Sequence, residues 1–352
     1  MTDGLEKKNR IVAVGTSLGG LEALRTVLSS LPENLAAPML IVMHIGAFRS
    51  VLPQLLSPVC TLPVTHAIDG TVLEPSKIYI APPDRHLVVQ DGRVRLTTAS
   101  KENFTRPAID PLFRSVAVEY GPRAIAVVLT GDLDDGAAGA AAVDACGGRI
   151  IVEAPNESVA ASMPAAALRA VPSATVVPLD GVGQAIVDAL RQPIKGVSMS
   201  PQKQRIEAEA RMTLTGFSSP EELDRLGTRS TLTCPDCGGV VWEISDAPPL
   251  RYRCHTGHAF SEASLDAAQK ADAEDALWTS VRHVEERAML AARRARMAET
   301  LGDDARAKSE RDLSQRLLRL GGALRDFVLD SAGNDDDPSS GPSDNESPIS
   351  AS

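Results

Sequence analysis

The chain has 352 residues, of which 43% are hydrophobic, and its formal net charge is −10 at pH 7. This length is enough for about two domains with a sizeable core. Neither half contains a basic tract, which argues against nucleic acid as the main partner. No run of 18 apolar residues and no N-terminal leader are recognised, so we expect a cytoplasmic protein without membrane insertion.

The first half alternates short apolar segments with stretches of helical spacing. Residues 10–15 predict a strand, the turn from Gly15 to Gly20 ends it, and apolar residues then recur at helical spacing as far as Leu31. Strands separated by helices predict an α/β fold with a doubly wound, mostly parallel sheet. Similar pairs of strand and helix are predicted at 124–129 with the alanine-rich stretch ending at Gly147, at 149–152 with 163–171, and at 174–179 with 182–190.

Residues 78–98 have a different pattern. Apolar residues alternate with polar ones on both sides of Asp91-Gly92, a dipeptide typical of tight hairpin turns. We therefore expect a β-hairpin that lies on the main sheet.

Three polar residues of different chemistry each follow a predicted strand. Ser17 comes after residues 10–15, His44 after 39–43, and Asp135 after 124–129. In an open parallel sheet the ligand crevice lies outside the carboxyl ends of the strands, so these side chains are expected to meet there. A serine nucleophile, a histidine base and an orienting carboxylate would form an acyl-transfer site, with donors for an oxyanion at the helix that follows Ser17.

Each of these residues also has an ordinary interpretation. Glycine-rich turns such as the one around Ser17 cradle phosphates or only reverse the chain. His44 could be a strand-end histidine, and Asp135 before Gly136 is typical of a helix N-cap or a turn. The order Ser, His, Asp along the chain also differs from the Ser, Asp, His order of the α/β-hydrolases.

An ordered series of stretches between about residues 10 and 190 resembles the catalytic domain of the CheB family, the bacterial chemotaxis receptor protein-glutamate methylesterases. The resemblance implies hydrolysis of glutamate γ-methyl esters on chemoreceptor helices, deamidation of certain glutamines, and no catalytic cofactor. It also implies that Ser17, His44 and Asp135 are the catalytic triad, and Arg106 becomes a candidate to position the acidic substrate helix. The stretches are Gly15-Thr-Ser-Leu-Gly-Gly, Val42-Met-His, Asp69-Gly70, Tyr79-Ile-Ala-Pro-Pro-Asp-Arg-His86, Arg106-Pro-Ala-Ile-Asp-Pro-Leu-Phe113, Leu129-Thr-Gly-Asp-Leu-Asp-Asp-Gly136 and Ser162-Met-Pro164.

The chain departs from the family pattern in two places that bear on activity. Regulated members carry a receiver domain before the esterase domain, whereas the first strand here is expected at about residue 10, which predicts a receiverless member. Asp132-Leu133 stand where family members usually have methionine and glycine, beside the expected oxyanion donors. A catalytically weakened adaptor of a chemosensory pathway, or an esterase for another ester, therefore remain alternatives.

The second half contains a different motif. Cys234 and Cys237 form a C-x2-C pair, followed after sixteen residues by Cys254, with His258 four residues further on. Thiolates and an imidazole at such spacing are typical of a tetrahedral structural Zn²⁺ site, and we take these four residues as the ligands. His255 competes with His258 for the fourth position. Three incidental buried cysteines are the alternative.

The remaining segments complete the expected organisation. After a catalytic domain at 1–190, residues 191–229 are expected to be a linker with a short helix at about 203–212, and 230–260 a zinc-ribbon-like module. Residues 261–332 are expected to form a helical hairpin, with helices at 261–300 and 303–330 that could also pair between two copies of the chain. Residues 333–352 are expected to be disordered, and Cys60 and Cys146 to serve only in apolar packing.

Overall fold

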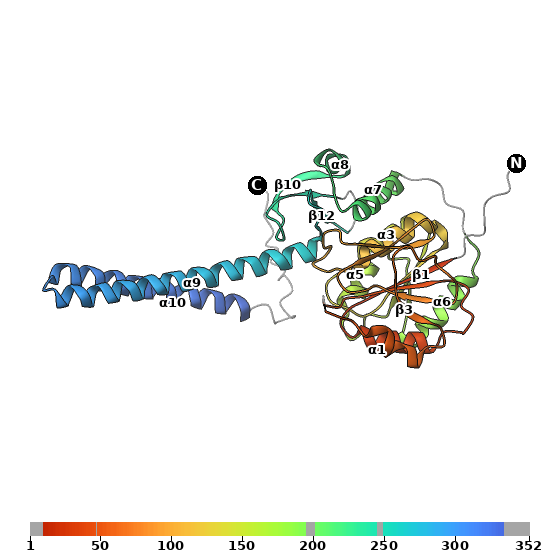
Figure 1. The fold of residues 1–352 in the computed structure, drawn as a ribbon, viewed down its shortest axis with the longest axis horizontal. Coiled ribbons are helices and arrows are strands. Elements are labelled where there is room, and N and C mark those ends of the chain that lie inside the picture. Colours follow the sequence, from red (N-terminus) through yellow and green to blue (C-terminus); the bar gives the residue numbers. More distant parts are fainter. Residues whose placement is uncertain (1–9, 47, 195–200, 245–248, 334–352) are drawn as a thin grey trace, which may run out of the picture. The chain divides into compact units, whose positions relative to one another are not determined.

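The computed structural model describes residues 10–46, 48–194, 201–244 and 249–333. The chain divides into two compact units, one ending at Asp266 and one starting at Ala267 (Figure 1). Among the described residues, no helix combines the length and the apolar character needed to cross a membrane.

The first unit contains a seven-stranded sheet in which every pairing is parallel. This confirms the predicted α/β fold with a parallel central sheet. The order β3-β4-β2-β1-β7-β8-β9 places β1 between β2 and β7. The strands are β1 (Ile11–Thr16), β2 (Met39–Met43), β3 (Val64–His66), β4 (Ile78–Ile80), β7 (Ala124–Val128), β8 (Arg149–Glu153) and β9 (Thr175–Val177).

Helices cover both faces of this sheet, and the central strands are therefore apolar on both sides. In β1, Ile11 and Ala13 belong to the core on one face, whereas Val12 and Val14 belong to the core on the other. One face carries α3 (Ile109–Tyr120), α4 (Ala137–Ala145) and α5 (Ser162–Ala170), and the other carries α1 (Gly20–Ser29), α2 (Leu52–Leu56) and α6 (Val182–Arg191). Single 3₁₀ turns lie at η1 (Ser57–Val59), η2 (Gly121–Arg123) and η3 (Leu179–Gly181).

The expected hairpin is present but shorter than the sequence pattern indicated. β5 (His86–Gln90) and β6 (Arg93–Thr97) pair antiparallel as a separate two-stranded sheet, whereas β4 belongs to the main sheet. Asp91 and Gly92 both adopt positive φ, at 54° and 67°, as a tight hairpin turn requires. An apolar run at 78–80 cannot by itself distinguish a hairpin strand from a strand of the buried parallel sheet.

Residues 201–226, which we expected to be mainly a linker, form two helices that are part of the first unit. α7 (Pro201–Thr215) buries Ile206 and Met212, and α8 (Pro220–Leu226) begins with a capping box made by Ser219 and Glu222. The polar sequence of α7 hid this packing, because only a few apolar side chains point inward.

A second sheet, antiparallel, follows within the same unit. It consists of β10 (Thr228–Thr233), β11 (Val240–Glu243), β12 (Arg251–Cys254) and β13 (Ala259–Ser261), in that order. α9 (Glu262–Thr300) begins directly after β13 and continues into the second unit, where α10 (Asp304–Gly333) follows it. There the two helices are antiparallel neighbours, joined for example by the Ser314 hydroxyl, which donates to the carbonyl of Ala288 at 2.9 Å. The expected disordered tail lies almost entirely outside the described residues.

Candidate active site

Ser17 lies in the turn between β1 and the N-terminus of α1. Its backbone N–H donates to the carbonyl of Thr130 at 2.9 Å, which ties this turn to the one after β7. Gly131 packs directly against the serine: a Cβ at position 131 would lie 2.2 Å from Met163 Sδ and 2.8 Å from Ser17 Cβ. Only glycine fits this close approach of the two turns.

The side chains of Ser17, His44 and Asp135 form a continuous hydrogen-bonded chain. Ser17 Oγ lies 3.1 Å from His44 Nδ1, and His44 Nε2 lies 2.7 Å from Asp135 Oδ2. Since an ionised carboxylate can only accept hydrogen bonds, Nε2 carries the proton of the neutral imidazole. Nδ1 is then free to accept the proton of the serine hydroxyl, as a general base must.

The position of this chain in the sheet follows from the topology. After β1 the polypeptide continues to β2, which lies toward one edge of the sheet, and after β7 it continues to β8, which lies toward the other edge. The strands β1 and β7 therefore flank the point where the strand order reverses. Ser17 and Asp135 lie in the turns after these two strands, at the crevice where open α/β sheets bind ligands. The site is open to solvent: Ser17 and His44 are half-buried and the neighbouring Leu18 is exposed.

Asp135 is buried and receives two hydrogen bonds on each carboxylate oxygen. Oδ2 accepts from His44 and from the backbone N–H of Ile109 at 2.6 Å. Oδ1 accepts from the backbone N–H of Asp110 at 3.1 Å and from the side-chain amide of Asn103 at 3.0 Å. Burial opposes ionisation, but the hydrogen bonds from His44, Ile109 and Asn103 hold the pKa of Asp135 below its ordinary value.

Two of these four donors belong to the first turn of α3. Helix N-terminal N–H groups point along the axis and favour negative charge, so α3 stabilises the carboxylate of Asp135. Asp110 in the same turn accepts from the N–H groups of Gly136 and Gly139 and joins α3 to α4. Burial and the neighbouring Asp135 carboxylate raise the pKa of Asp110.

The turn that contains Asp132 and Leu133, where the chain departs from the family pattern, is exposed. Both Asp132 and Leu133 face solvent, where water screens the Asp132 charge. Leu133 has φ 59°, a conformation that glycine adopts freely and that few other residues do. The backbone at position 133 therefore keeps a glycine-like conformation although the residue is leucine.

Arg106, expected to contact a substrate, is engaged within the protein. Its guanidinium forms an ion pair with Asp84 at 2.7 Å and donates to the carbonyl groups of Thr98 and Ala99. These contacts hold together the loops on either side of the β5–β6 hairpin.

Comparison with known proteins agrees with this geometry. The sequence model described as CheB methylesterase matches residues 12–186, which span β1 to α6 and include all three residues of the hydrogen-bonded chain. Residues 12–186 belong to the CheB methylesterase family. We refer to them below as the CheB domain.

Two curated relatives of the CheB domain share the same functional name. The protein-glutamate methylesterase/protein-glutamine glutaminase 4 of Myxococcus xanthus is 39% identical over 183 residues, which are 51% of this chain and 52% of the relative. The protein-glutamate methylesterase/protein-glutamine glutaminase of Moorella thermoacetica is 39% identical over 183 residues, 50% of this chain and 43% of that protein. The chain thus spans about half the length of the curated relatives it matches.

Among solved structures, the CheB methylesterase catalytic domain of Thermotoga maritima is 33% identical to the chain. The match covers 51% of this chain and 98% of that one, with a TM-score of 0.49.

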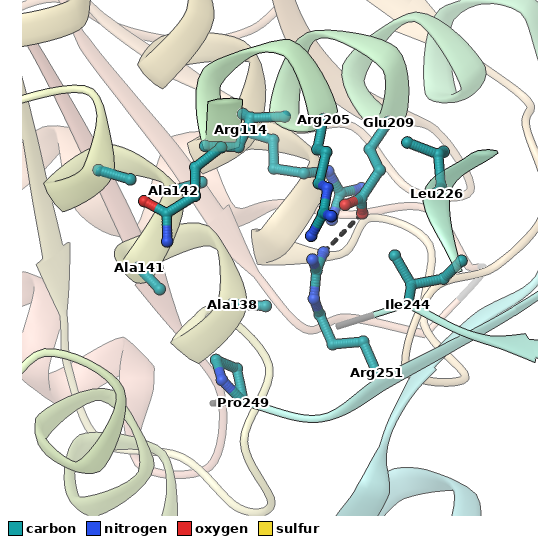
Figure 2. Close-up of a pocket in the computed structure, with 13 residues that line it drawn as sticks. Arg114, Ala138, Ala141, Ala142, Arg205, Glu209, Leu226, Ile244, Pro249 and Arg251 are labelled. Atoms are coloured by element: carbon teal, nitrogen blue, oxygen red, sulfur yellow. Dashed lines mark hydrogen bonds and ion pairs between the residues drawn. The ribbon is translucent and has the colours of Figure 1, made fainter. Parts of the chain in front are cut away.

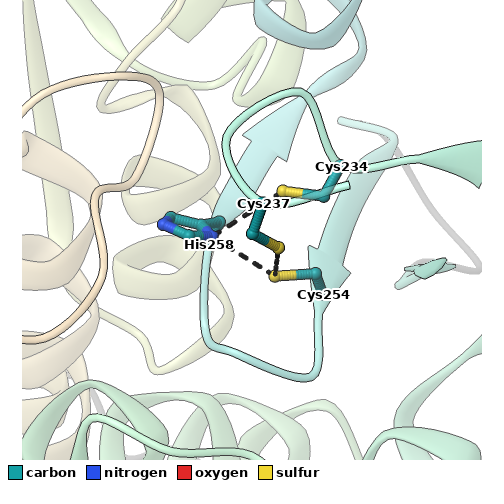
Figure 3. Close-up of side chains that lie close together, drawn as sticks. All are labelled: Cys234, Cys237, Cys254 and His258. Atoms are coloured by element: carbon teal, nitrogen blue, oxygen red, sulfur yellow. Dashed lines mark hydrogen bonds between the residues drawn. The ribbon is translucent and has the colours of Figure 1, made fainter. Parts of the chain in front are cut away.

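A second cluster lies in the antiparallel sheet, where Cys234, Cys237, Cys254 and His258 converge (Figure 3). Their ligand atoms all lie within 4.8 Å of one another. The Cys237 and Cys254 sulfurs are 3.8 Å apart, and His258 Nδ1 is 3.7 Å from Cys234 Sγ and 3.5 Å from Cys254 Sγ. Tetrahedral Zn²⁺ with ordinary bond lengths separates two sulfurs by about 3.8 Å and a sulfur from a nitrogen by about 3.6 Å.

The surroundings of this cluster also suit a metal ion. His258 turns Nδ1 toward the sulfurs, while its Nε2 lies 3.8 Å from a carboxylate oxygen of Asp236. His255 lies against Gly239 instead, and its ring is not part of the cluster. Of the other two cysteines, Cys146 is buried in the core of the CheB domain and Cys60 packs beside the opposite core.

A cavity of about 110 Å³ lies between α4, α7 and the antiparallel sheet (Figure 2). Its wall includes Arg251, which forms an ion pair with the buried carboxylate of Glu209 at 2.5 Å. None of the three residues of the hydrogen-bonded chain lines it. The cavity lies at the interface between the CheB domain and the elements that follow it in the sequence.

Sequence reasoning missed two contributors to the site. The helix α3 is not among the elements predicted from the sequence, where only its first residues, 109–113, occur as part of a stretch that resembles the CheB family. Asn103 was not singled out either, since a lone asparagine in a polar loop carries no signal of its own. Its importance depends on contacts with residues far away in the sequence.

Proposed function

We propose that this protein is a protein-glutamate methylesterase that hydrolyses γ-methyl esters of glutamate side chains on chemoreceptor helices. The observation that carries the proposal is the hydrogen-bonded chain Ser17–His44–Asp135 at the switch point of a CheB domain. The names of the curated relatives supply the substrate class.

The first half of the reaction forms an acyl-enzyme. Ser17 Oγ attacks the γ-carbonyl carbon of the ester while His44 Nδ1 takes the hydroxyl proton. Asp135, fixed by its four hydrogen bonds, holds the imidazole and stabilises the imidazolium that forms. Collapse of the tetrahedral intermediate breaks the bond to the methoxy oxygen, which takes the proton from His44 and leaves as methanol.

The second half restores the enzyme. Water attacks the acyl carbon and gives a proton to His44, and the glutamate γ-carboxylic acid leaves as Ser17 recovers its proton. The negative oxygen of both tetrahedral intermediates needs N–H donors, and the N-terminus of α1 after Ser17 offers them. A glutamine side chain enters the same sequence with ammonia as the leaving group, which accounts for a glutaminase activity.

Release of methanol from methylated chemoreceptors in membranes tests the proposal. The full chain should release methanol, and Ser17→Ala should reduce release to the level without enzyme. Ser29→Ala is the matched control, because this exposed serine of α1 donates only to the carbonyl of Thr26 and should leave the rate unchanged. Equal release by Ser17→Ala and the unmodified chain would refute the assignment of the nucleophile.

The proposal extends to location and partners. Chemoreceptor methylation sites lie on cytoplasmic helices, so the protein would act in the cytoplasm, on those helices. We further propose the helices α9 and α10 as a place of self-association, because α9 and α10 keep large exposed apolar side chains such as Leu290, Met297 and Phe327.

We also propose that the cluster of Cys234, Cys237, Cys254 and His258 binds one structural Zn²⁺. Four protein ligands close the coordination sphere, which leaves no position for a substrate. The distances between the ligand atoms, which match tetrahedral geometry, support this assignment.

A further inference from the structure

The antiparallel sheet and the start of α9, residues 228–266, form what we call the C-terminal module. Within the first unit, β13 of this module lies beside the loop 100–105 of the CheB domain. Asn103 N–H donates to the carbonyl of Ala259 at 2.8 Å, and Glu102 and Ala259 form a parallel bridge. The loop that carries Asn103 is thus held by backbone hydrogen bonds to the module.

The side chain of Asn103 connects the module to the triad aspartate. It is 5% exposed, and its Nδ2 donates to Asp135 Oδ1 at 3.0 Å. Its Oδ1 accepts from the backbone N–H of Ser261 at 3.0 Å and from the hydroxyl of Ser264 at 2.9 Å. An amide can donate from one end and accept at the other, so asparagine satisfies both partners at once.

Buried ion pairs fasten the module at the same place. Glu102, beside Asn103, pairs with Arg114 of α3 at 2.6 Å and with Arg253 of β12 at 2.9 Å. All three side chains are at most 3% exposed. Loss of one partner from such a pair leaves a buried charge uncompensated. The two ion pairs therefore stabilise the contact between the module and the loop 100–105.

The proposed metal ligands lie directly before the docking strand. Cys254 ends β12, His258 precedes β13, and the turn between them is closed by a hydrogen bond from Cys254 N–H to the His258 carbonyl at 2.9 Å. The next residue, Ala259, is the one that pairs with the Asn103 loop. A metal ion that fixes both ends of this turn therefore fixes the strand that holds Asn103.

We propose that Asn103 is a positioning residue for Asp135, and that the metal-bound C-terminal module holds Asn103 in place. Esterase activity then depends on a metal ion that does not touch the substrate. The inference rests on the proposed function, because it assigns to the module a role in the chemistry of Ser17.

Two substitutions separate the functions of the Asn103 amide. Asn103→Asp keeps an oxygen for Ser261 and Ser264. It loses the Nδ2 donor to Asp135 and to Asp110, which the same nitrogen contacts at 3.2 Å, and adds a third carboxyl group beside these two. It should lower kcat about 10- to 100-fold with KM unchanged. Ser264→Ala removes one hydrogen bond to the Asn103 oxygen and should lower kcat by a smaller factor. Ser230→Ala is the control: its hydroxyl lies in β10 of the same module and accepts from the N–H of Leu232, away from the loop that carries Asn103, and kcat should not change. Equal kcat for Asn103→Asp and the unmodified chain would overturn the role of Asn103.

Removal of the metal tests the second half of the proposal. The full chain loaded with Zn²⁺ is compared with the same protein after treatment with a chelator, and circular dichroism checks that the CheB domain stays folded. Removal of the metal should lower kcat of the unmodified chain. In Asn103→Ala it should lower kcat little further, because both changes act through the hydrogen bond from Asn103 to Asp135. Re-addition of Zn²⁺ should restore only the unmodified chain. Equal fractional losses in both proteins, or no loss in either, would contradict this dependence.

Covalent labelling of Ser17 by a fluorophosphonate distinguishes failure of this inference from failure of the proposed function. Labelling reports the reactivity of the serine whatever the natural substrate is. Absence of labelling in the Zn²⁺-loaded chain would refute the proposed function together with the inference. Labelling of Asn103→Asp and of the metal-stripped chain at the rate of the unmodified Zn²⁺-loaded chain would refute the inference alone.

Discussion

Asn103 and Asp135 are joined by a hydrogen bond of 3.0 Å between a side-chain amide and a buried carboxylate. The same amide accepts hydrogen bonds from Ser261 and Ser264 of the C-terminal module. The environment of Asp135 is therefore completed by a part of the chain beyond the CheB domain. We propose this contact as the route by which the C-terminal module influences catalysis.

The carboxylate of Asp135 is expected to be essential for fast turnover. Asp135→Asn replaces it with an amide whose nitrogen cannot accept the hydrogen bond from the N–H of His44 Nε2. A corresponding change in a serine protease lowers kcat by about 10⁴-fold. We expect a loss of similar size here, measured as methanol release. Asp144→Asn, at an exposed position of α4, serves as the control and should retain full activity. A kcat for Asp135→Asn close to that of the control would contradict the assigned role.

Asp132 and Leu133 are expected to be compatible with a competent enzyme. Because Asp132 is exposed and Leu133 already has a glycine-like φ, the double change Asp132→Met and Leu133→Gly should alter kcat by less than about threefold. The comparison is made on the purified full-length chains with the same receptor preparation. A gain of a hundredfold or more would instead support the alternative of a weakened, adaptor-like protein.

Gly131 is expected to tolerate no side chain. In Gly131→Ala the new methyl group would collide with Met163 Sδ, which can move aside, and with Ser17 Cβ, which can move only together with its backbone. Displacement of Ser17 by a fraction of an ångström to 1 Å should lower kcat about 10²-fold. In Gly181→Ala the nearest atoms lie at an ordinary 3.6 Å, so this variant should keep the activity of the unmodified chain. Fluorophosphonate labelling rates of the two variants provide the measurement.

Metal analysis of the purified chain should find one Zn²⁺ per polypeptide. Cys237→Ser removes an exposed ligand and should abolish stoichiometric binding, whereas Cys60→Ser should retain it because Cys60 lies outside the cluster. Added Zn²⁺ should raise the thermal unfolding temperature of the apo form, since an ion that binds only the folded state stabilises it. Folding of the chain without any bound metal, at an unchanged unfolding temperature, would refute the structural zinc.

Stability is expected to fall in acid through Glu102. Although burial opposes its ionisation, Arg114 and Arg253 hold the pKa of Glu102 far below its ordinary 4.5. The unfolded chain therefore takes up a proton first as the pH falls below about 4.5, and the contribution of Glu102 to stability, complete above that pH, is progressively lost.

Urea unfolding between pH 7 and pH 3.5 measures this effect. Glu102→Gln should flatten the pH dependence of the free energy of unfolding and lower it at pH 7 by about 3–5 kcal/mol, because two buried arginines lose their partner. Glu33→Gln, at an exposed position, should reproduce the profile of the unmodified chain. A profile for Glu102→Gln as steep as that of the unmodified chain would exclude Glu102 as the source.

Much of the fold was predictable because it depends on local patterns. Short apolar runs followed by glycine turns and helical spacing indicated β1, β7 and the helices that follow them, and parallel strands must bring their carboxyl ends to one edge. The meeting of Ser17, His44 and Asp135 follows from those two facts. The spacing of the cysteines and His258 likewise anticipated the cluster, since its members lie on two tight turns.

The sequence by itself thus determined the parallel sheet, the three side chains at its edge and the composition of the cysteine cluster. The tertiary structure alone decided that α3 presents its N-terminal N–H groups to Asp135, that residues 201–226 pack as helices, and that Asn103 joins the C-terminal module to the site. The physical reason is that hydrogen bonds such as those from Asn103 to Asp135 and from Ser261 to Asn103 link residues 32 and 158 positions apart. Periodicity and turn signals describe neighbours in the chain, and they carry no information about which distant polar groups will satisfy one another once they are buried together.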